Sequence, residues 1–160
     1  MQYKLKPRLP DFDYRGCYRY FITICTNGKQ KLFSDGTRVK SVLEILAAES
    51  RKHGFTVWGY CFMPDHLHLL TEGERADSDM KTFVRVFKQK AGYAYGKAPT
   101  GSKSGLWQAG YYDHVLRKDE DLQGVLQYIL NNPVRKGFVK HFADYPHSGS
   151  FAMDIRQITF

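Results

Sequence analysis

The chain has 160 residues, 42% of them hydrophobic, which is enough for one globular core and too little for two well-filled ones. Lys and Arg number 24 against 16 Asp and Glu, so the formal charge of +8 fits a polyanionic partner without identifying one. The three cysteines are isolated and no apolar run suits a signal peptide or a membrane span, so we expect a soluble protein of the reducing cytoplasm, organised as one domain over 1–160; the cysteines are Cys17, Cys25 and Cys61.

The first half of the chain alternates strand and helix signals. Residues 1–14 form a basic arm punctuated by prolines, and the β-branched and aromatic run 18–26 predicts a strand. Apolar residues at three- and four-residue spacing predict a helix over 38–53. Two short apolar runs, 55–62 and 66–71, are separated by Met, Pro and Asp, which is typical of a hairpin.

The second half continues the alternation. A helix with a basic polar side is expected over 78–95, followed by a flexible linker over 96–106 because that interval is rich in Gly and Ser. A strand over 111–117 leads to a helix that begins near 119 and must stop near Pro133, and the remainder looks irregular. This order predicts an α+β, ferredoxin-like split β-α-β sandwich: an antiparallel sheet with helices on one face plus a C-terminal helix.

Two histidines two residues apart are the first candidate for chemistry. His66 and His68 lie on a predicted strand, so both side chains leave the same face of the sheet, where two imidazoles can hold one divalent metal. An isolated pair of this kind is more often a pair of ordinary half-buried histidines on an amphipathic strand. The pair alone therefore does not decide between a metal site and a packing role.

The last predicted helix carries a tyrosine and an amide. Tyr128 and Asn132 are four residues apart, so they stack on one side of a helix at the border of its apolar stripe and can point into a cleft. Asn131, at i+3, is an alternative partner of the phenol. Packing of the tyrosine, and a helix-terminal role for the asparagine ahead of Pro133, are the structural alternatives.

Three segments together resemble a known family. CFMPDHLHLL, LWQAGYYDHVLR and YILNNPVRKG resemble, in order, the histidine, middle and tyrosine motifs of REP-associated tyrosine transposases. These belong to the HUH single-tyrosine transposases related to small bacterial insertion sequences. The resemblance extends from Tyr18 to Gly137. Asp65 stands where the family commonly has Asn, and the third ligand of related enzymes is more often Gln or His than Asn.

The resemblance implies both a reaction and roles for residues. His66, His68 and Asn132 would bind a metal. Tyr128 would be the nucleophile that forms a 5′-phosphotyrosine link with single-stranded DNA, and we expect that DNA to form hairpins. A set of two nitrogen ligands and one oxygen ligand suits Mn²⁺ or Mg²⁺; zinc is the alternative ion that an experiment must exclude. Phenols are stronger acids than alkyl alcohols, so the tyrosine can both attack phosphorus and leave again.

Basic residues outside these motifs are candidates for contact with DNA phosphates. Lys81, Arg85 and Lys88 share one side of the second predicted helix, although a solvated face explains them equally well. The other candidates lie in the arm and beside the tyrosine helix: Lys4, Lys6, Arg8, Arg135, Lys136 and Lys140.

Two other functions remain open from the sequence. One is a domesticated, non-mobile nuclease acting at palindromic repeats with the same chemistry. The other is a non-catalytic nucleic-acid-binding module in which His66 and Tyr128 only pack or stack. Related insertion-sequence enzymes work as dimers whereas the REP-associated branch includes monomers, so a homodimer and a monomer are both compatible with the resemblance.

Overall fold

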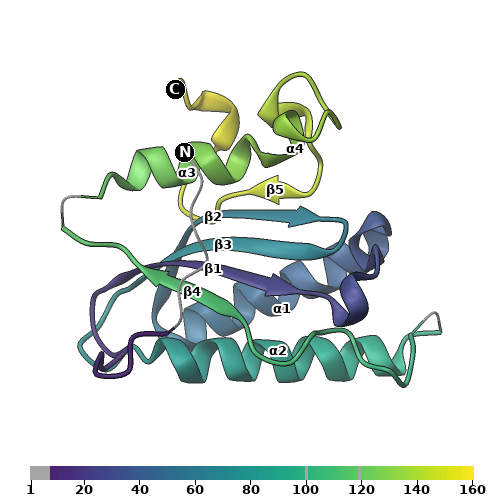
Figure 1. Ribbon diagram of the computed structural model, residues 1–160, viewed down its shortest axis with the longest axis horizontal. Coiled ribbons are helices and arrows are strands. Elements are labelled where there is room, and N and C mark those ends of the chain that lie inside the picture. Colours follow the sequence, from purple (N-terminus) through teal and green to yellow (C-terminus); the bar gives the residue numbers. More distant parts are fainter. Residues whose placement is uncertain (1–7, 100, 119) are drawn as a thin grey trace.

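The computed structural model describes residues 8–99, 101–118 and 120–160, and within them five strands form one antiparallel sheet in the order β4-β1-β3-β2-β5. The strands are β1 (Arg19–Cys25), β2 (Phe55–Met63), β3 (His66–Gly73), β4 (Tyr112–Val115) and β5 (Ser148–Gly149). The helices α1 (Gly36–His53) and α2 (Met80–Lys97) cover one face, whereas α3 (Leu122–Leu130) and the short α4 (Asn132–Arg135) lie on the other (Figure 1). The α+β fold expected from the sequence is confirmed.

The layer of α1 and α2 builds the larger core. Apolar side chains of both helices pack against the inward positions of the sheet; they include Val42, Leu46, Phe83 and Phe87 on the helices and Ile22, Ile24, Leu67 and Leu69 on the strands. Helix α1 starts at Gly36 because the Asp35 carboxylate accepts hydrogen bonds from the backbone N–H groups of Thr37 and Arg38. It ends at His53, and the next residue, Gly54, has a left-handed φ of 71° that suits glycine.

Strand pairing fixes which side chains meet on the opposite face. In the β1–β3 ladder Thr23 pairs with His68 and Cys25 pairs with His66. Residues directly opposite one another in a ladder share a face, so both histidines emerge beside β1 on the side of the sheet that carries α3. The sequence-based expectation that the two imidazoles share one face is therefore confirmed.

Helix α3 packs on this second face. Its apolar residues Val125, Leu126 and Ile129 form a second core with strand residues that include Cys61 and Leu70. Residues near the C-terminus complete that core, among them Phe142, Tyr145 and Ile155. The helix that bears Tyr128 is thereby held against the same sheet face as the two histidines.

One expectation about this helix is wrong. A single helix was expected to carry both Tyr128 and Asn132, but α3 ends at Leu130 and α4 starts at Asn132, after Asn131 with φ −81° and ψ 0°. Pro133 lies in the first turn of α4, where a residue without a backbone N–H is favoured. The single continuous helix on which the i,i+4 argument for Asn132 rested is therefore divided at Asn131.

Other segments are more ordered than the sequence suggested. Helix α2 continues to Lys97, inside the expected linker over 96–106, and Leu106 at its end is buried in the larger core. The region after Val134, expected to be irregular, contains β5 and short 3-10 helices at Phe142–Asp144 and Ile155–Gln157. Two further 3-10 turns, Asn27–Lys29 and Leu32–Ser34, follow β1.

Three smaller findings bear on the remaining expectations. Cys17, Cys25 and Cys61 are all free thiols, as expected. Within the described residues, no helix combines the length and the apolar character that crossing a bilayer requires. Part of the basic arm packs on the fold, because Tyr14 is buried and its hydroxyl accepts a hydrogen bond from the backbone N–H of Leu9. Lys4 and Lys6 lie outside the described residues.

The seat of α3 leads to a first prediction. A Cβ added to Gly59 of β2 would stand 2.3 Å from Cδ1 of Leu126, so Gly59→Ala should displace α3 and lower the free energy of unfolding by about 1 to 3 kcal/mol. Gly124→Ala, within α3 itself, meets nothing closer than 3.4 Å and should instead stabilise the protein by about 0.5 to 1 kcal/mol. Urea unfolding of both variants checks the pair, and equal effects of the two would contradict this account of the seat.

Candidate active site

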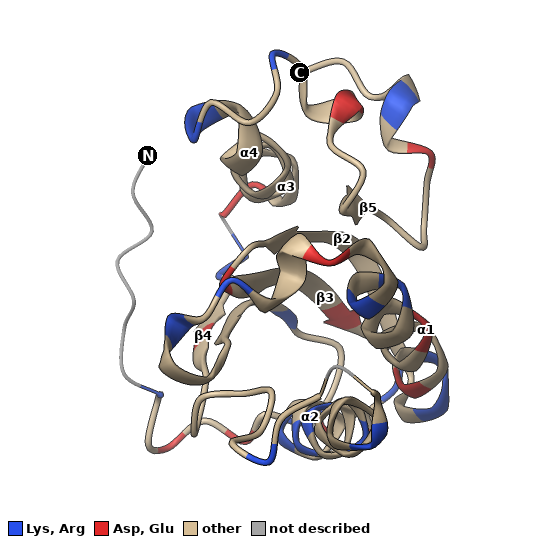
Figure 2. Ribbon diagram, turned by 90° about the vertical axis from the view of Figure 1, so that its right-hand side faces the viewer, with Lys and Arg blue, Asp and Glu red and all other residues tan. Residues whose placement is uncertain are grey.

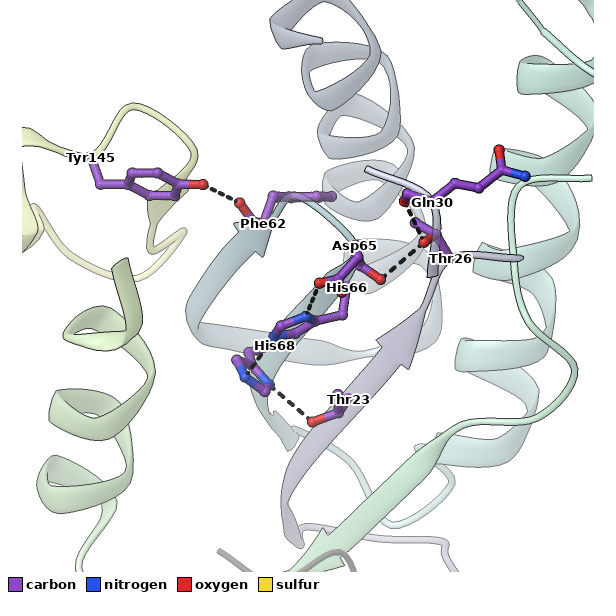
Figure 3. Close-up of polar contacts among 8 residues, drawn as sticks. All are labelled: Thr23, Thr26, Gln30, Phe62, Asp65, His66, His68 and Tyr145. Atoms are coloured by element: carbon purple, nitrogen blue, oxygen red, sulfur yellow. Dashed lines mark hydrogen bonds and ion pairs between the residues drawn. The ribbon is translucent and has the colours of Figure 1, made fainter. Parts of the chain in front are cut away.

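Two imidazoles face one another on β3. Nε2 of His66 lies 3.1 Å from Nε2 of His68, and the ring centroids are 4.5 Å apart (Figure 3). The other nitrogen of each ring contacts the protein: His66 Nδ1 donates to the Asp65 carboxylate at 2.6 Å, and His68 Nδ1 is hydrogen-bonded to the Thr23 hydroxyl at 2.9 Å. These outer contacts fix both rings with their Nε2 atoms turned toward a common point.

Burial keeps the second imidazole neutral. His68 is 9% exposed, and desolvation, followed by the neighbouring His66 and the charge of Arg135, lowers the pKa of His68 to about 3. At neutral pH one nitrogen of its ring is therefore unprotonated. A neutral imidazole is the form that coordinates a metal ion.

The candidate nucleophile faces the same space. Tyr128 lines a cleft of about 340 Å³ together with both histidines; the remaining walls are Phe21, Thr23, Cys25, Lys29 and Asp65. The Tyr128 ring packs edge-on against Phe21 at 6.1 Å between centroids, and Phe21 in turn lies 5.3 Å from the His68 ring. Residues from β1, β3 and α3 are thus brought together although they are far apart in the sequence.

The guanidinium group of Arg135, in α4, contacts the ring of Tyr128. Its guanidinium carbon lies 4.1 Å from the centroid of the Tyr128 ring, a cation–π distance. The same charge acts on His68 and on Cys61, which shows that it stands close to the imidazole pair. Arg135 was expected from the sequence to contact DNA, and the structure places it beside the candidate nucleophile.

The donor set suits a metal held by nitrogen and additional oxygen ligands. The two Nε2 atoms, 3.1 Å apart, are close enough for both imidazoles to bind one divalent ion when neither carries a proton at that position. Within the described residues, no group of three His, Cys, Asp or Glu side chains could hold a metal ion. A complete shell would therefore need an amide, water or phosphate oxygen, and the buried Asn132 (7% exposed) stays the predicted amide ligand.

A lysine that sequence reasoning missed also enters the cleft. Lys29 has φ 52°, in the left-handed region that side chains other than those of Gly, Asn and Asp rarely adopt, and it follows Gly28 with φ 61°. Two positive φ values and the bond from Gln30 N–H to the Asn27 carbonyl describe a type I′ turn. The side chain of Thr26 ties this turn to the carbonyl of Asp65, so Lys29 is held over the imidazole site.

The expected phosphate contacts lie in different settings. Lys81 and Arg85 are exposed on α2, whereas Lys136 is exposed directly after α4; α2 and α4 lie on opposite faces of the sheet (Figure 2). Lys88 donates to the carbonyls of Gln108 and Gly110, and Arg8 is ion-paired with the buried Asp113 at 3.1 Å. Lys88 and Arg8 therefore already have partners within the protein, and contact of any of these cations with DNA stays a prediction.

The chain matches a described family over most of its length. A family model described as "Transposase IS200 like" matches residues 16–132, which include both histidines and Tyr128. The chain belongs to this family. Its members are enzymes that cut and rejoin DNA, so the cleft is the candidate active site of a transposase.

Relatives agree with this assignment. The transposase is 29% identical over 154 residues to a protein of Haemophilus influenzae named provisionally as a REP-associated tyrosine transposase, covering 91% of this chain and 85% of the relative. It is 25% identical over 136 residues to the REP-associated tyrosine transposase of Escherichia coli, covering 85% and 77%. A solved REP-associated tyrosine transposase bound to a REP hairpin has the same fold, with a TM-score of 0.76 and 24% identity over 95% of this chain and 87% of that one.

The buried imidazole gives this transposase a pH-dependent stability. Because the folded pKa of His68, about 3, lies below the value of about 6.5 for a free histidine, the unfolded state takes up a proton that the folded state refuses as pH falls from 6.5 toward 3. Stability is lost over that window, and His68→Gln should reduce the slope of unfolding free energy against pH by up to about 1.4 kcal/mol per pH unit. Urea unfolding in EDTA between pH 7 and pH 4 measures it; identical slopes would contradict a neutral buried His68.

Proposed function

We propose that the protein is a metal-dependent endonuclease and strand transferase for single-stranded, hairpin-forming DNA that acts through a 5′-phosphotyrosine intermediate. The observation that carries the proposal is the convergence of His66, His68 and Tyr128 on one cleft from β3 and α3. If Tyr128 served only for packing, there would be no reason for the two imidazoles to be oriented with their Nε2 atoms facing one another in the same cleft. The solved relative bound to a REP hairpin supports a hairpin as the substrate of this chain.

The metal would be held by His66 and His68 with Asn132 as the third ligand. Bound Mn²⁺ or Mg²⁺ would supply positive charge to the scissile phosphate as a Lewis acid. Asp65 and Thr23 orient the two imidazoles through their Nδ1 atoms. Both residues are therefore positioning residues, because they act on the reaction through the histidines.

The tyrosine performs the bond exchange. The Tyr128 oxygen forms a bond to phosphorus while the bond from phosphorus to the 3′-oxygen of the neighbouring nucleotide breaks. The phenol loses its proton, and the departing 3′-oxygen takes one up, which leaves a free 3′-hydroxyl and a 5′-phosphotyrosine. Attack by a second 3′-hydroxyl reverses the exchange on a new partner strand without ATP, because one phosphodiester bond replaces another.

Two cations assist the tyrosine in this proposal. Arg135 lies over the ring at 4.1 Å and fixes its direction. Lys29 also lines the cleft, in a strained backbone conformation that is characteristic of residues placed for function. Its ammonium group would contact a non-bridging oxygen of the scissile phosphate, where charge builds up in the transition state.

The proposed compartment is the cytoplasm. The three free thiols are consistent with a reducing environment.

Covalent trapping tests the nucleophile. End-labelled hairpin DNA with a single-stranded flank is incubated with Mn²⁺, and the products are separated on a denaturing gel. The wild type should give a slower band in which DNA is attached to protein, and EDTA should abolish it. Tyr128→Phe should remove the adduct, because the ring stays and only the attacking oxygen is lost. Tyr93→Phe, an exposed tyrosine of α2, is the matched control and should keep it. An adduct formed by Tyr128→Phe would sink this assignment.

Lys29 is tested by charge substitution. Lys29→Gln should slow cleavage at saturating DNA by roughly 10- to 100-fold, with a smaller effect on the dissociation constant, since the charge acts mainly on the transition state. Lys29→Arg should keep most of the rate. Lys31→Gln removes an equal charge from an exposed position two residues away and serves as the control. If both Gln variants lose the same factor, the effect is long-range attraction and Lys29 has no special role.

A further inference from the structure

We propose that the catalytic cleft continues into a subsite for one nucleobase, in which the base stacks on Tyr112 and is read by the amide of Gln108. The ligand is an unpaired base next to the scissile phosphate. The inference rests on the proposed function, since it assumes that single-stranded DNA enters the cleft. It adds a recognition site at the free edge of the sheet that the imidazoles and Tyr128 do not form.

Strand register places Tyr112 beside the imidazole site. In the β1–β4 ladder Tyr112 pairs with Thr23, and Thr23 is the residue whose hydroxyl contacts His68. Opposite residues share a face, so Tyr112 and His68 lie on the same side of the sheet with β1 between their strands. Two strand spacings of about 4.8 Å separate β4 from β3, so the backbone of Tyr112 lies about 10 Å from that of His68.

Tyr112 is exposed, whereas the preceding residue, Tyr111, is partly buried. Tyr112 is 40% exposed, and it lines a hollow rather than a packed surface. Tyr111, on the other face, lies under the Arg8 guanidinium at 4.6 Å and its hydroxyl donates to the Met80 sulfur. One tyrosine of the pair is therefore part of the internal packing, and the other presents a ring to solvent beside the cleft. Exposed rings at such a place are stacking platforms for unpaired bases.

The hollow adjoins the catalytic cleft. It has a volume of about 180 Å³, and Cys25 forms part of the wall of both spaces. Its other walls are Gln108, Ala109, Gly110, Tyr111 and Tyr112. None of these lining residues carries a charged side chain, so the hollow suits a neutral, flat heterocycle better than a phosphate. The side-chain amide of Gln108 can both donate to and accept from a base edge.

The wall of the hollow is rigid before any ligand arrives. The backbone N–H of Gln108 donates to the Cys25 carbonyl at 2.9 Å, which extends the pairing beyond β4. On the other side, the Lys88 ammonium donates to the carbonyls of Gln108 at 3.1 Å and Gly110 at 2.6 Å. A preformed wall loses little conformational freedom on binding, so the stacking contact adds directly to affinity.

The test combines side-chain removal with base removal. Cleavage is measured as kcat/KM for wild type and Tyr112→Ala on hairpins that carry one abasic site, moved nucleotide by nucleotide across the scissile bond. Tyr112→Ala should lose roughly 10- to 100-fold on intact DNA, and Tyr112→Phe should recover most of that loss because the ring is kept. One abasic position should cost the wild type a similar factor and cost Tyr112→Ala nothing further. Tyr93→Ala, an exposed ring on α2, should match the wild type throughout.

Two results would overturn the subsite. One is a Tyr112→Phe variant as impaired as Tyr112→Ala; the other is a pair of losses that multiply at every abasic position. A binding measurement keeps the inference separate from the chemistry. With Tyr128→Phe protein and no metal, 2-aminopurine at the responsive position should be quenched on binding, and Tyr112→Ala should abolish the quenching. Absence of cleavage in every protein would remove the proposed reaction, whereas unchanged quenching in Tyr112→Ala would remove the subsite alone.

Discussion

The pairing of β1 with β3 is the constraint on which the candidate site depends. It sets Thr23 opposite His68, and the hydroxyl of Thr23 occupies one nitrogen of that imidazole. Asp65 does the same for His66 from the turn between β2 and β3. A slip of one residue in this ladder would turn both histidines to the packed face of the sheet, where α1 and α2 leave no room for them. The geometry of the site is thus a property of sheet register, which the larger core secures.

The second face of the sheet is divided between packing and chemistry. Helix α3 covers β2 and β3 with Val125, Leu126 and Ile129, and the segment after α4 extends this core toward β5. Tyr128 stands at the border of that packed area, next to Phe21 of β1. Desolvation by the same packing lowers the pKa of His68 and keeps it neutral. Burial on this face therefore both holds the tyrosine helix in place and keeps the imidazole of His68 neutral.

Local patterns were sufficient to predict most of this arrangement. Alternation along β3 placed both histidines on one face, and apolar spacing found the helix that carries Tyr128. What the sequence did not indicate depends on contacts between distant segments. Thr23 and His68 are 45 residues apart, and no local signal links them. The cleft position of Lys29 likewise depends on the contact of Thr26 with Asp65, and β5 is too short to stand out as a strand.

The segment from Tyr128 to Asn132 shows how a helix predicted as continuous can be divided ahead of a proline. The spacing of four residues to Tyr128 suggested one helical face, but the break at Asn131 starts a new helix with Pro133 in its first turn. The direction of the Asn132 side chain depends on how α4 packs, and sequence spacing alone does not predict that packing. The four-residue rule holds only where backbone bonds run without interruption. After Leu130, the burial of a side chain is a better guide to its role than its spacing from Tyr128. Asn132 is buried.

The division of the sheet also places the cleft at one edge of the helix-covered area. Helix α3 and the C-terminal segment occupy the surface above β2, β3 and β5 (Figure 1). The walls of the cleft that come from β1, namely Phe21, Thr23 and Cys25, lie next to the edge strand β4. In the proposed reaction the DNA strand reaches the imidazoles along this edge, because Lys29 lines the cleft and Tyr112 lines the hollow that shares Cys25 with it. The edge strand β4 on this side has only four residues.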